Sequence, residues 1–192
     1  MIAHLRGRLL EKHPNQVIVD VNGVGYSVFI PVSTFSRLPD RGSEARLYIY
    51  THVRDDTLAL YGFQTDREKL LFEKLISVSG IGPRLAVTLL SGMDAEELST
   101  AIRRGEVQRL VRVPGVGRKT AERLVLELRD KLGPVGVGAP AASTLDEEVI
   151  SALLNLGCTR PAAAAAVEKA RHNGAPEQFE PLFRAALALV MK

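Results

Sequence analysis

Two segments of this chain repeat the same arrangement of glycines, apolar residues and basic residues. Residues 75–86 (LISVSGIGPRLA) align with residues 110–121 (LVRVPGVGRKTA) at a constant offset of 35 residues. Each copy is typical of a helix, a tight Gly-x-Gly turn and a second helix. Glycine allows positive φ angles and the close approach of another backbone. Because the amides at a helix start attract anions, the repeat predicts two phosphate-binding turns.

The predicted nucleic-acid contacts comprise backbone amides and cationic side chains. The amides belong to Gly80, Ile81 and Gly82 in the first copy, and to Gly115, Val116 and Gly117 in the second. The cations are Arg84, Arg118, Lys119 and Arg123. Since phosphates carry no base information, we expect binding to be largely independent of sequence.

Other interpretations of the repeat can be weighed against this one. A packed helical hairpin accommodates a single Gly-x-Gly turn, but two aligned copies followed by basic residues favour phosphate binding. Residues 115–120 (GVGRKT) superficially look like a P-loop, yet Arg118 occupies the position of the glycine that must precede the lysine. The histidines are scattered and Cys158 is isolated, so we expect no metal site and no cofactor. A helix-hairpin-helix repair enzyme acting on damaged duplex DNA is the alternative function, although the sequence identifies no catalytic residue for it.

The composition indicates a globular protein with a slightly basic centre. The chain has 192 residues, of which 46% are hydrophobic and 24% charged, and its formal net charge is +3. Residues 63–132 hold 13 Lys and Arg against 10 Asp and Glu. The longest apolar run, residues 185–191, is far shorter than a membrane-spanning helix, and the N-terminus lacks the features of a secretory signal. With one cysteine no internal disulfide can form, so we expect a cytoplasmic protein without membrane partners.

Residues 1–63 are predicted to form a small barrel. Apolar residues recur with a period of two on both sides of an Asn22-Gly23 hairpin turn. Two further strands are expected around residues 47–49 and 58–60, separated by residues 52–57. About five strands in this length favour a closed or nearly closed barrel, because closure removes exposed strand edges.

The two repeated turns lie in a predicted all-helical domain, residues 64–132. Thr65 with Glu68, and Asp94 with Glu97, form capping-box patterns at helix starts. Further helices are expected at about 83–91, 94–104, 106–112 and 118–131.

The last part of the chain is predicted to be a linker followed by a small helical domain. Residues 133–144 are rich in glycine and proline, which indicates a flexible linker. Residues 145–192 have the apolar spacing of three short helices. Thr144 with Glu147 forms a third capping-box pattern, and Thr159 is expected to cap the second of these helices.

Further motifs accompany the repeat along the chain. They are residues 53–56 (VRDD), 60–63 (LYGF), 79–84 (SGIGPR) and 114–123 (PGVGRKTAER), with Arg6-Gly7 and residues 23–26 (GVGY). Together they resemble the RuvA family, the Holliday-junction recognition subunits of bacterial branch-migration complexes, over essentially the whole chain. The resemblance implies an α+β multidomain fold. It would comprise an N-terminal OB-fold β-barrel, a central all-α double helix-hairpin-helix domain and a C-terminal three-helix, UBA-like domain.

The resemblance also implies a non-catalytic DNA-binding subunit that acts in homologous recombination and DNA repair. The first two domains would assemble as a fourfold homotetramer on a four-way junction, because a fourfold ring presents one equivalent grip to each arm. Either one tetramer or two facing tetramers would enclose the junction. The C-terminal domain would dock on RuvB, the hexameric ATPase motor, and the complex would also meet the junction nuclease RuvC.

Individual residues take roles from the same resemblance. Asp55 and Asp56 align with the acidic pin of the family, a hairpin tip where carboxylates repel phosphates and keep paired strands apart. Their simpler interpretation is two exposed turn residues. We expect Arg54 to reach DNA beside the pin. Three short helices hardly bury every apolar residue, so Leu153 and Leu156 are candidate contacts for a partner.

Overall fold

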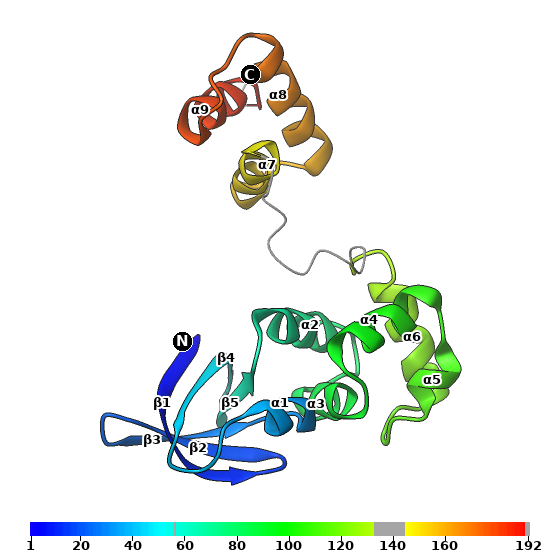
Figure 1. Ribbon diagram of the computed structural model, residues 1–192. Coiled ribbons are helices and arrows are strands. Elements are labelled where there is room, and N and C mark those ends of the chain that lie inside the picture. The colour runs from blue at the N-terminus through cyan, green and yellow to red at the C-terminus, as the bar shows by residue number, and fades with distance from the viewer. Residues whose placement is uncertain (56, 133–144, 191–192) are drawn as a thin grey trace. The chain divides into compact units, whose positions relative to one another are not determined.

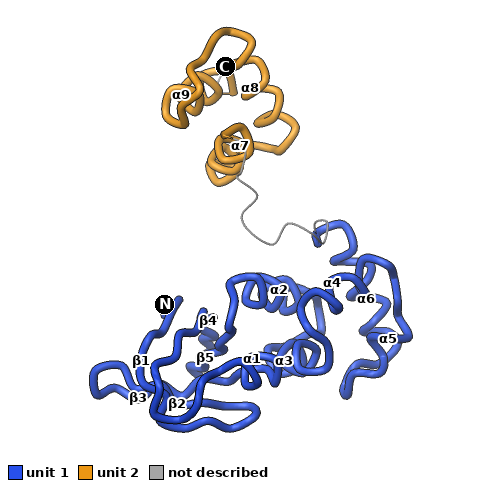
Figure 2. The backbone as a smooth tube through the Cα atoms, viewed as in Figure 1, with its two compact units in different colours: residues 1–135 blue, residues 136–192 orange. Residues whose placement is uncertain are grey.

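The structure is a computed structural model that describes residues 1–55, 57–132 and 145–190. The chain divides into two compact units, residues 1–135 and 136–192 (Figure 2). Asp56, Thr144 and the predicted linker over residues 133–144 lie outside the described residues, so the predictions made for them stay predictions.

Five strands form a closed barrel at the start of the first unit (Figure 1). They are β1 (His4–His13), β2 (Gln16–Val21), β3 (Val24–Phe29), β4 (Glu44–Arg54) and β5 (Thr57–Phe63). Their order around the barrel is β1-β2-β3-β5-β4, and only the β3–β5 pair is parallel. Alternate residues such as Leu9, Val17, Val19 and Leu47 fill the interior. The predicted barrel is confirmed.

Two details of the barrel bear on its sequence patterns. Asn22 and Gly23 have φ angles of 53° and 88°, as a two-residue hairpin turn between β2 and β3 requires. The predicted separation of two strands by residues 52–57 is wrong, because β4 and β5 stay paired up to Arg54 and Thr57. Both faces of this hairpin tip are exposed, so the hydrophobic alternation fades although the backbone ladder continues.

A short helix that the sequence did not predict connects β3 to β4. This helix, α1 (Val32–Arg37), begins after Pro31 and buries only Thr34. The Lys12 ammonium donates to the carbonyl of Leu38 at its end, with a distance of 2.8 Å, and so stabilises the helix C-terminus. The sequence pattern placed residues 32–37 in the strand-rich region, because a six-residue helix is too short to show helical periodicity.

Over residues 66–132 the first unit consists of helices and the turns between them, as predicted. These helices are α2 (Asp66–Ile76), α3 (Pro83–Gly92), α4 (Ala95–Arg104), α5 (Val107–Val111) and α6 (Arg118–Leu128). Thr65 and Glu68 form the reciprocal capping box at the start of α2, which confirms that prediction. Asp94 accepts from the amides of Glu96 and Glu97 at the start of α4. The Glu97 carboxylate, however, pairs with Arg109 at 3.9 Å.

The core of the helices is distinct from the barrel interior and extends to the barrel through β5. The ring of Phe72 on α2 lies 5.3 Å from that of Tyr61 and 4.9 Å from that of Phe63, both on β5. These aromatic residues join the core that the helices build around Leu89 and Leu124. The change from strand to helix after Phe63 is therefore a change of secondary structure inside one packed unit.

Over residues 145–190, the second unit forms three helices, α7 (Leu145–Asn155), α8 (Arg160–His172) and α9 (Phe179–Val190). Their core includes Val149, Val167 and Leu182. Thr159 occupies the N-cap position of α8, but its side chain makes no capping hydrogen bond. The Glu147 carboxylate pairs with Arg160 at 3.1 Å.

Candidate nucleic-acid interface

The two repeated turns have the same backbone conformation. Gly80 and Gly115 have φ angles of 88° and 83°. Gly82 and Gly117, two residues later, have φ/ψ angles of −87°/169° and −79°/164° and are the N-caps of α3 and α6. The sequence repeat is therefore a structural repeat of helix, turn and helix (Figure 1).

The two glycines of each turn differ in their backbone conformation and surroundings. Gly80 and Gly115 adopt positive φ angles, which strain any residue with a Cβ. Gly82 and Gly117 adopt ordinary extended angles, and a Cβ added at either would meet no heavy atom within 4 Å. Neither the backbone nor a described neighbour demands glycine at these two positions. Their bare surface leaves room for another molecule to approach the backbone closely.

The amides of Ile81 and Val116 are already used inside the protein. They donate to the carbonyls of Val78 and Val113 at 3.0 Å and 3.1 Å. Each bond closes a four-residue turn whose third residue is the positive-φ glycine, as in a type II turn. Their prediction as phosphate contacts is corrected: they close the turns, and their side chains are buried in the core. The dipeptide Pro114-Gly115 is a sequence signal for such a turn that could have shown this.

The helix starts of α3 and α6 supply amides that lack a side-chain acceptor at the N-cap. A glycine N-cap has no side chain that could accept hydrogen bonds from the first turn of its helix. The first residue of α3 is Pro83, which has no N–H, so the first amide donor of this helix is that of Arg84. The first residue of α6 is Arg118, whose N–H is the first amide donor of that helix. Two helices of 10 and 11 residues thus present unpaired first-turn amides and the positive end of a helix dipole.

The four predicted cations differ in their surroundings. Arg84 and Lys119 are exposed, and neither forms an ion pair within the described residues. Arg118 donates to the Glu122 carboxylate at 2.9 Å, and this hydrogen bond and charge raise the pKa of the arginine. Arg84 and Lys119 are therefore the cations best placed to meet a phosphate.

Arg123 connects the two turns. Its guanidinium donates from Nη1 to the carbonyl of Ser79 at 2.9 Å, so α6 holds the turn that precedes α3. In the opposite direction, Leu85 on α3 lies against the second turn, where a Cβ on Gly115 would be 3.3 Å from its Cδ1 atom. Each turn thus contacts the helix that follows the other turn, and this reciprocal packing sets the spacing between the two helix starts.

The tip of the β4–β5 hairpin carries the residues assigned to the acidic pin. Asp55 and Arg54 are exposed at this tip, whereas Asp56 lies outside the described residues. Val53 and Leu58 face each other across the hairpin with 66% and 68% of their surface exposed. The sequence reasoning missed this exposed apolar pair beside the charged tip.

Arg54 at the hairpin tip and Arg84 at the start of α3 both influence the pKa of the Tyr61 phenol. Burial raises the pKa of the Tyr61 phenol on β5, and the positive charges of Arg84 and Arg54 partly oppose that effect. Both arginines therefore lie within electrostatic reach of one hydroxyl.

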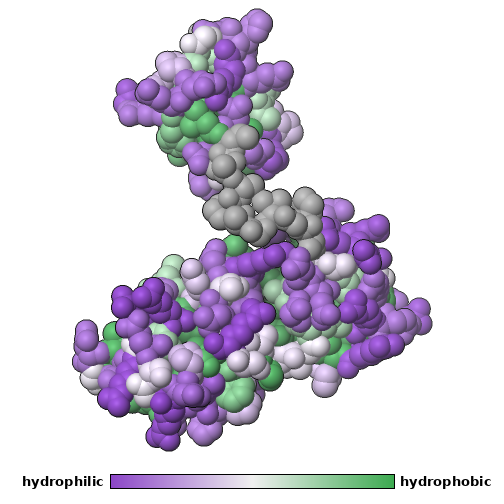
Figure 3. Space-filling model, in the orientation of Figure 1, coloured by the Kyte–Doolittle hydropathy of each residue, from purple (hydrophilic) through white to green (hydrophobic). Residues whose placement is uncertain are grey.

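In the second unit, the two candidate partner contacts have opposite environments. Leu153 is fully buried in the three-helix core, so its assignment to a partner surface is corrected. Leu156, at the end of the same segment, is 61% exposed. Phe179 is also exposed, with its ring stacked on Phe183 at 5.8 Å. Hydrophobic residues are visible among hydrophilic ones on this unit (Figure 3).

Neither a membrane-spanning helix nor a metal site is present in the described residues. Across residues 1–55, 57–132 and 145–190 we find no helix with the length and apolarity that a bilayer span requires. The same residues contain no group of three His, Cys, Asp or Glu side chains arranged to hold a metal ion.

The fold and the site define a tandem helix-hairpin-helix protein joined to a closed β-barrel. Residues 72–130 match the family model described as the SAM-like helix-hairpin-helix tandem. Residues 1–62 match the model described as the RuvA N terminal domain.

Similar proteins match nearly the whole chain. One from Solibacter usitatus is 67% identical over 197 residues, which cover 99% of this chain and 100% of that protein. One from Acidobacterium capsulatum is 53% identical with the same coverage, and one from Geotalea daltonii is 46% identical over 200 residues and the full length of both chains. All three are named Holliday junction branch migration complex subunit RuvA. This chain belongs to the RuvA family.

Proposed function

We propose that this protein binds four-way DNA junctions as the non-catalytic subunit of a branch-migration complex that acts in recombination and repair. One observation carries the proposal: two turns of equal geometry present open helix starts with bare glycine N-caps, at a spacing set by their reciprocal packing. The names of the related proteins support the same function.

Each turn would hold one DNA backbone by its phosphates. The first-turn amides of α3 and α6 find no side-chain acceptor at their glycine N-caps, so a phosphate oxygen would accept their hydrogen bonds. Arg84 and Lys119 add charge beside these helix starts. Because these contacts reach only the backbone, binding would be independent of base sequence and would weaken steeply with salt.

The junction would be recognised by an assembly of several copies. We propose a homotetramer, in which the exposed pair Val53 and Leu58 is available for contacts between copies near the hairpin tips. The carboxylate of Asp55, with that of Asp56, would lie at the centre and repel phosphates from the crossover. One or two such tetramers would cover the junction.

The second unit would recruit the other components of the complex. We propose that its exposed apolar residue Leu156 contributes to docking on RuvB, the ATPase motor, and that RuvC meets the same assembly on DNA. The cytoplasm remains the expected location.

A competition experiment tests the proposal. A labelled four-way junction is titrated with the protein at moderate salt, in the presence of excess linear duplex with the same arm sequences. We expect the junction complex to survive the competitor. Equal competition by duplex would refute junction recognition while leaving the phosphate-binding turns. Strand cleavage or base release from damaged duplex by the protein alone would support the repair-enzyme alternative.

A further inference from the structure

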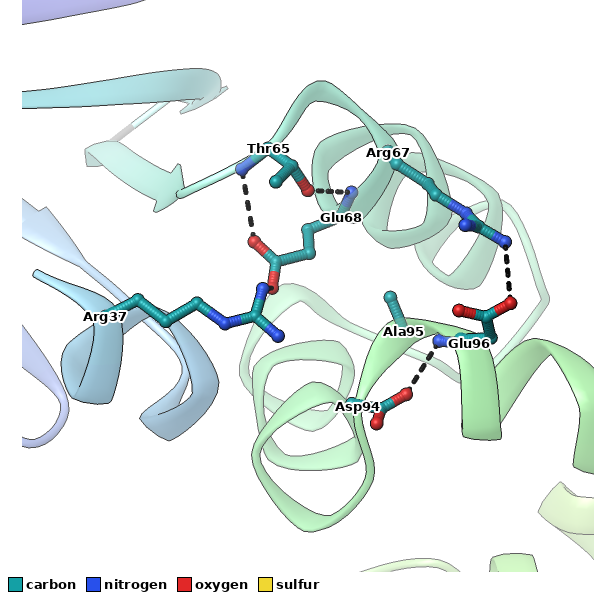
Figure 4. A pocket seen from close by; sticks show the side chains of 7 residues that line it. All are labelled: Arg37, Thr65, Arg67, Glu68, Asp94, Ala95 and Glu96. Carbon is teal, nitrogen blue, oxygen red and sulfur yellow. Dashed lines mark hydrogen bonds and ion pairs between the residues drawn. The ribbon is translucent and has the colours of Figure 1, made fainter. Parts of the chain in front are cut away.

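Glu68 on α2 is a buried carboxylate between the barrel and the helices. Only 4% of its side chain is exposed, which is unusual for a charged residue. Its Oε2 atom accepts from the amides of Gln64 and Thr65 at 3.0 Å and 3.2 Å. Its Oε1 atom lies 3.5 Å from Nη1 of Arg37, the last residue of α1. Figure 4 shows the Arg37 side chain reaching from α1 toward this carboxylate.

Capping alone does not account for this arrangement. A capping box needs only the hydrogen bonds between Thr65 and Glu68, and such a box is stable at an exposed helix start. Here the same carboxylate also meets a cation from a helix of the barrel. Glu68 therefore connects the first turn of the helical layer to α1 of the barrel.

The helix α1 also contacts the element that carries the first phosphate-binding turn. The amide of Val32, at the start of α1, donates to the Ser91 hydroxyl near the end of α3 at 3.1 Å. The N-terminus of α3 follows directly on Gly80 and Gly82. One short helix thus joins the barrel to α2 through Arg37 and to α3 through Val32.

We propose that the Arg37–Glu68 pair positions the barrel, with its hairpin tip, relative to the two phosphate-binding turns and so determines the preference for a four-way junction over linear duplex. The inference rests on the proposed function. A linear duplex needs only the turns, whereas a junction also needs the hairpin tip at a set orientation beside them. Weakening the pair therefore lowers junction affinity more than duplex affinity.

The pocket lined by Arg37 and Glu68 also contains a second ion pair, which provides a matched control. Arg67 on α2 pairs with Glu96 on α4 at 3.9 Å, entirely within the helical layer (Figure 4). The side chains of Arg37 and Arg67 are 54% and 44% exposed. Arg37→Gln and Arg67→Gln thus remove the same charge from similar environments, but only the first breaks a contact with the barrel.

The test compares the ratio of junction to duplex affinity in the full-length chain and both variants. We expect Arg37→Gln to lower this ratio about threefold, with a much smaller change in duplex affinity, and Arg67→Gln to leave the ratio unchanged. The double variant Arg37→Gln with Glu68→Gln should be no worse than the worse single variant, because both disrupt one contact. An equal effect of Arg37→Gln and Arg67→Gln on the ratio would overturn the proposal.

A second measurement separates this inference from the proposed function. Spin labels on cysteines at Val24 in the barrel and Leu126 on α6 report the distance between the two parts, in a Cys158→Ala background. Labelled protein is diluted with unlabelled protein so that the measured distances come from two labels in the same chain and not from neighbouring copies. We expect the distribution to broaden in Arg37→Gln but not in Arg67→Gln. If the unsubstituted protein shows no preference for junction over duplex, the proposed function is refuted. The spin-label distances would then still show whether the Arg37–Glu68 pair positions the barrel relative to the helices.

Discussion

Replacing Gly117 by alanine should separate DNA binding from stability. Its φ/ψ angles of −79° and 164° suit alanine, and the added methyl group meets no protein atom within 4 Å. Loss of glycine reduces the entropy of the unfolded chain and stabilises the fold by about 0.4–1 kcal/mol. Alanine is a poorer N-cap, which costs about 0.5–1 kcal/mol. The two effects oppose each other, so the free energy of unfolding should change by less than about 0.5 kcal/mol.

The effect on DNA affinity should be much larger. The methyl group would occupy the bare surface at Gly117, through which, on the proposed function, a phosphate would approach the first-turn amides of α6. A hydrogen bond from an amide to a charged group contributes about 1.5–3 kcal/mol. Loss of one such bond in each subunit raises the Kd of that subunit for duplex DNA by about 10-fold to 100-fold.

Fluorescence anisotropy with labelled duplex and four-way junction at one salt concentration measures this effect, and thermal unfolding measures stability. The matched control is Gly115→Ala, where φ is 83° and the added Cβ would stand 3.3 Å from Leu85. That variant should lose about 1–2 kcal/mol of stability. A folded Gly117→Ala protein that binds duplex with unchanged affinity would falsify the assignment of a phosphate to this helix start.

Four further outcomes are expected. Lys119→Ala should lower the slope of log Kd against log salt concentration by about 0.9, and an unchanged slope in a salt titration would exclude a phosphate contact. Asp55→Asn combined with Asp56→Asn should strengthen duplex binding and so lower the ratio of junction to duplex affinity in the competition assay; an unchanged ratio counts against the pin. Because burial raises the folded-state pKa of Tyr61, stability should fall as alkaline pH rises through that pKa, and Tyr61→Phe should reduce this loss in alkaline unfolding curves. Leu153→Ala should destabilise the second unit by about 2–5 kcal/mol, whereas Leu156→Ala should leave its melting temperature nearly unchanged, as calorimetry can establish.

Features encoded by neighbouring residues could be predicted from the sequence. The repeat at an offset of 35 residues indicated both helix-hairpin-helix turns, because the conformation of a turn depends on the few residues within it. The Thr65–Glu68 capping box and the Asn22-Gly23 hairpin turn were predicted for the same reason. The barrel was predicted from the period-two alternation of apolar residues, since that pattern follows from strand geometry alone.

Features that depend on distant residues were decided by the tertiary structure. The fold brings the carbonyl of Ser79, 44 residues away in the chain, within hydrogen-bond distance of the Arg123 guanidinium, a contact that the sequence did not predict. Leu153 and Leu156 looked equivalent until the packing of α8 and α9 buried one of them and left the other exposed. The physical reason is common to these cases. A side chain's partner is set by which elements meet in three dimensions, and neither local conformational preference nor hydrophobic period specifies that meeting.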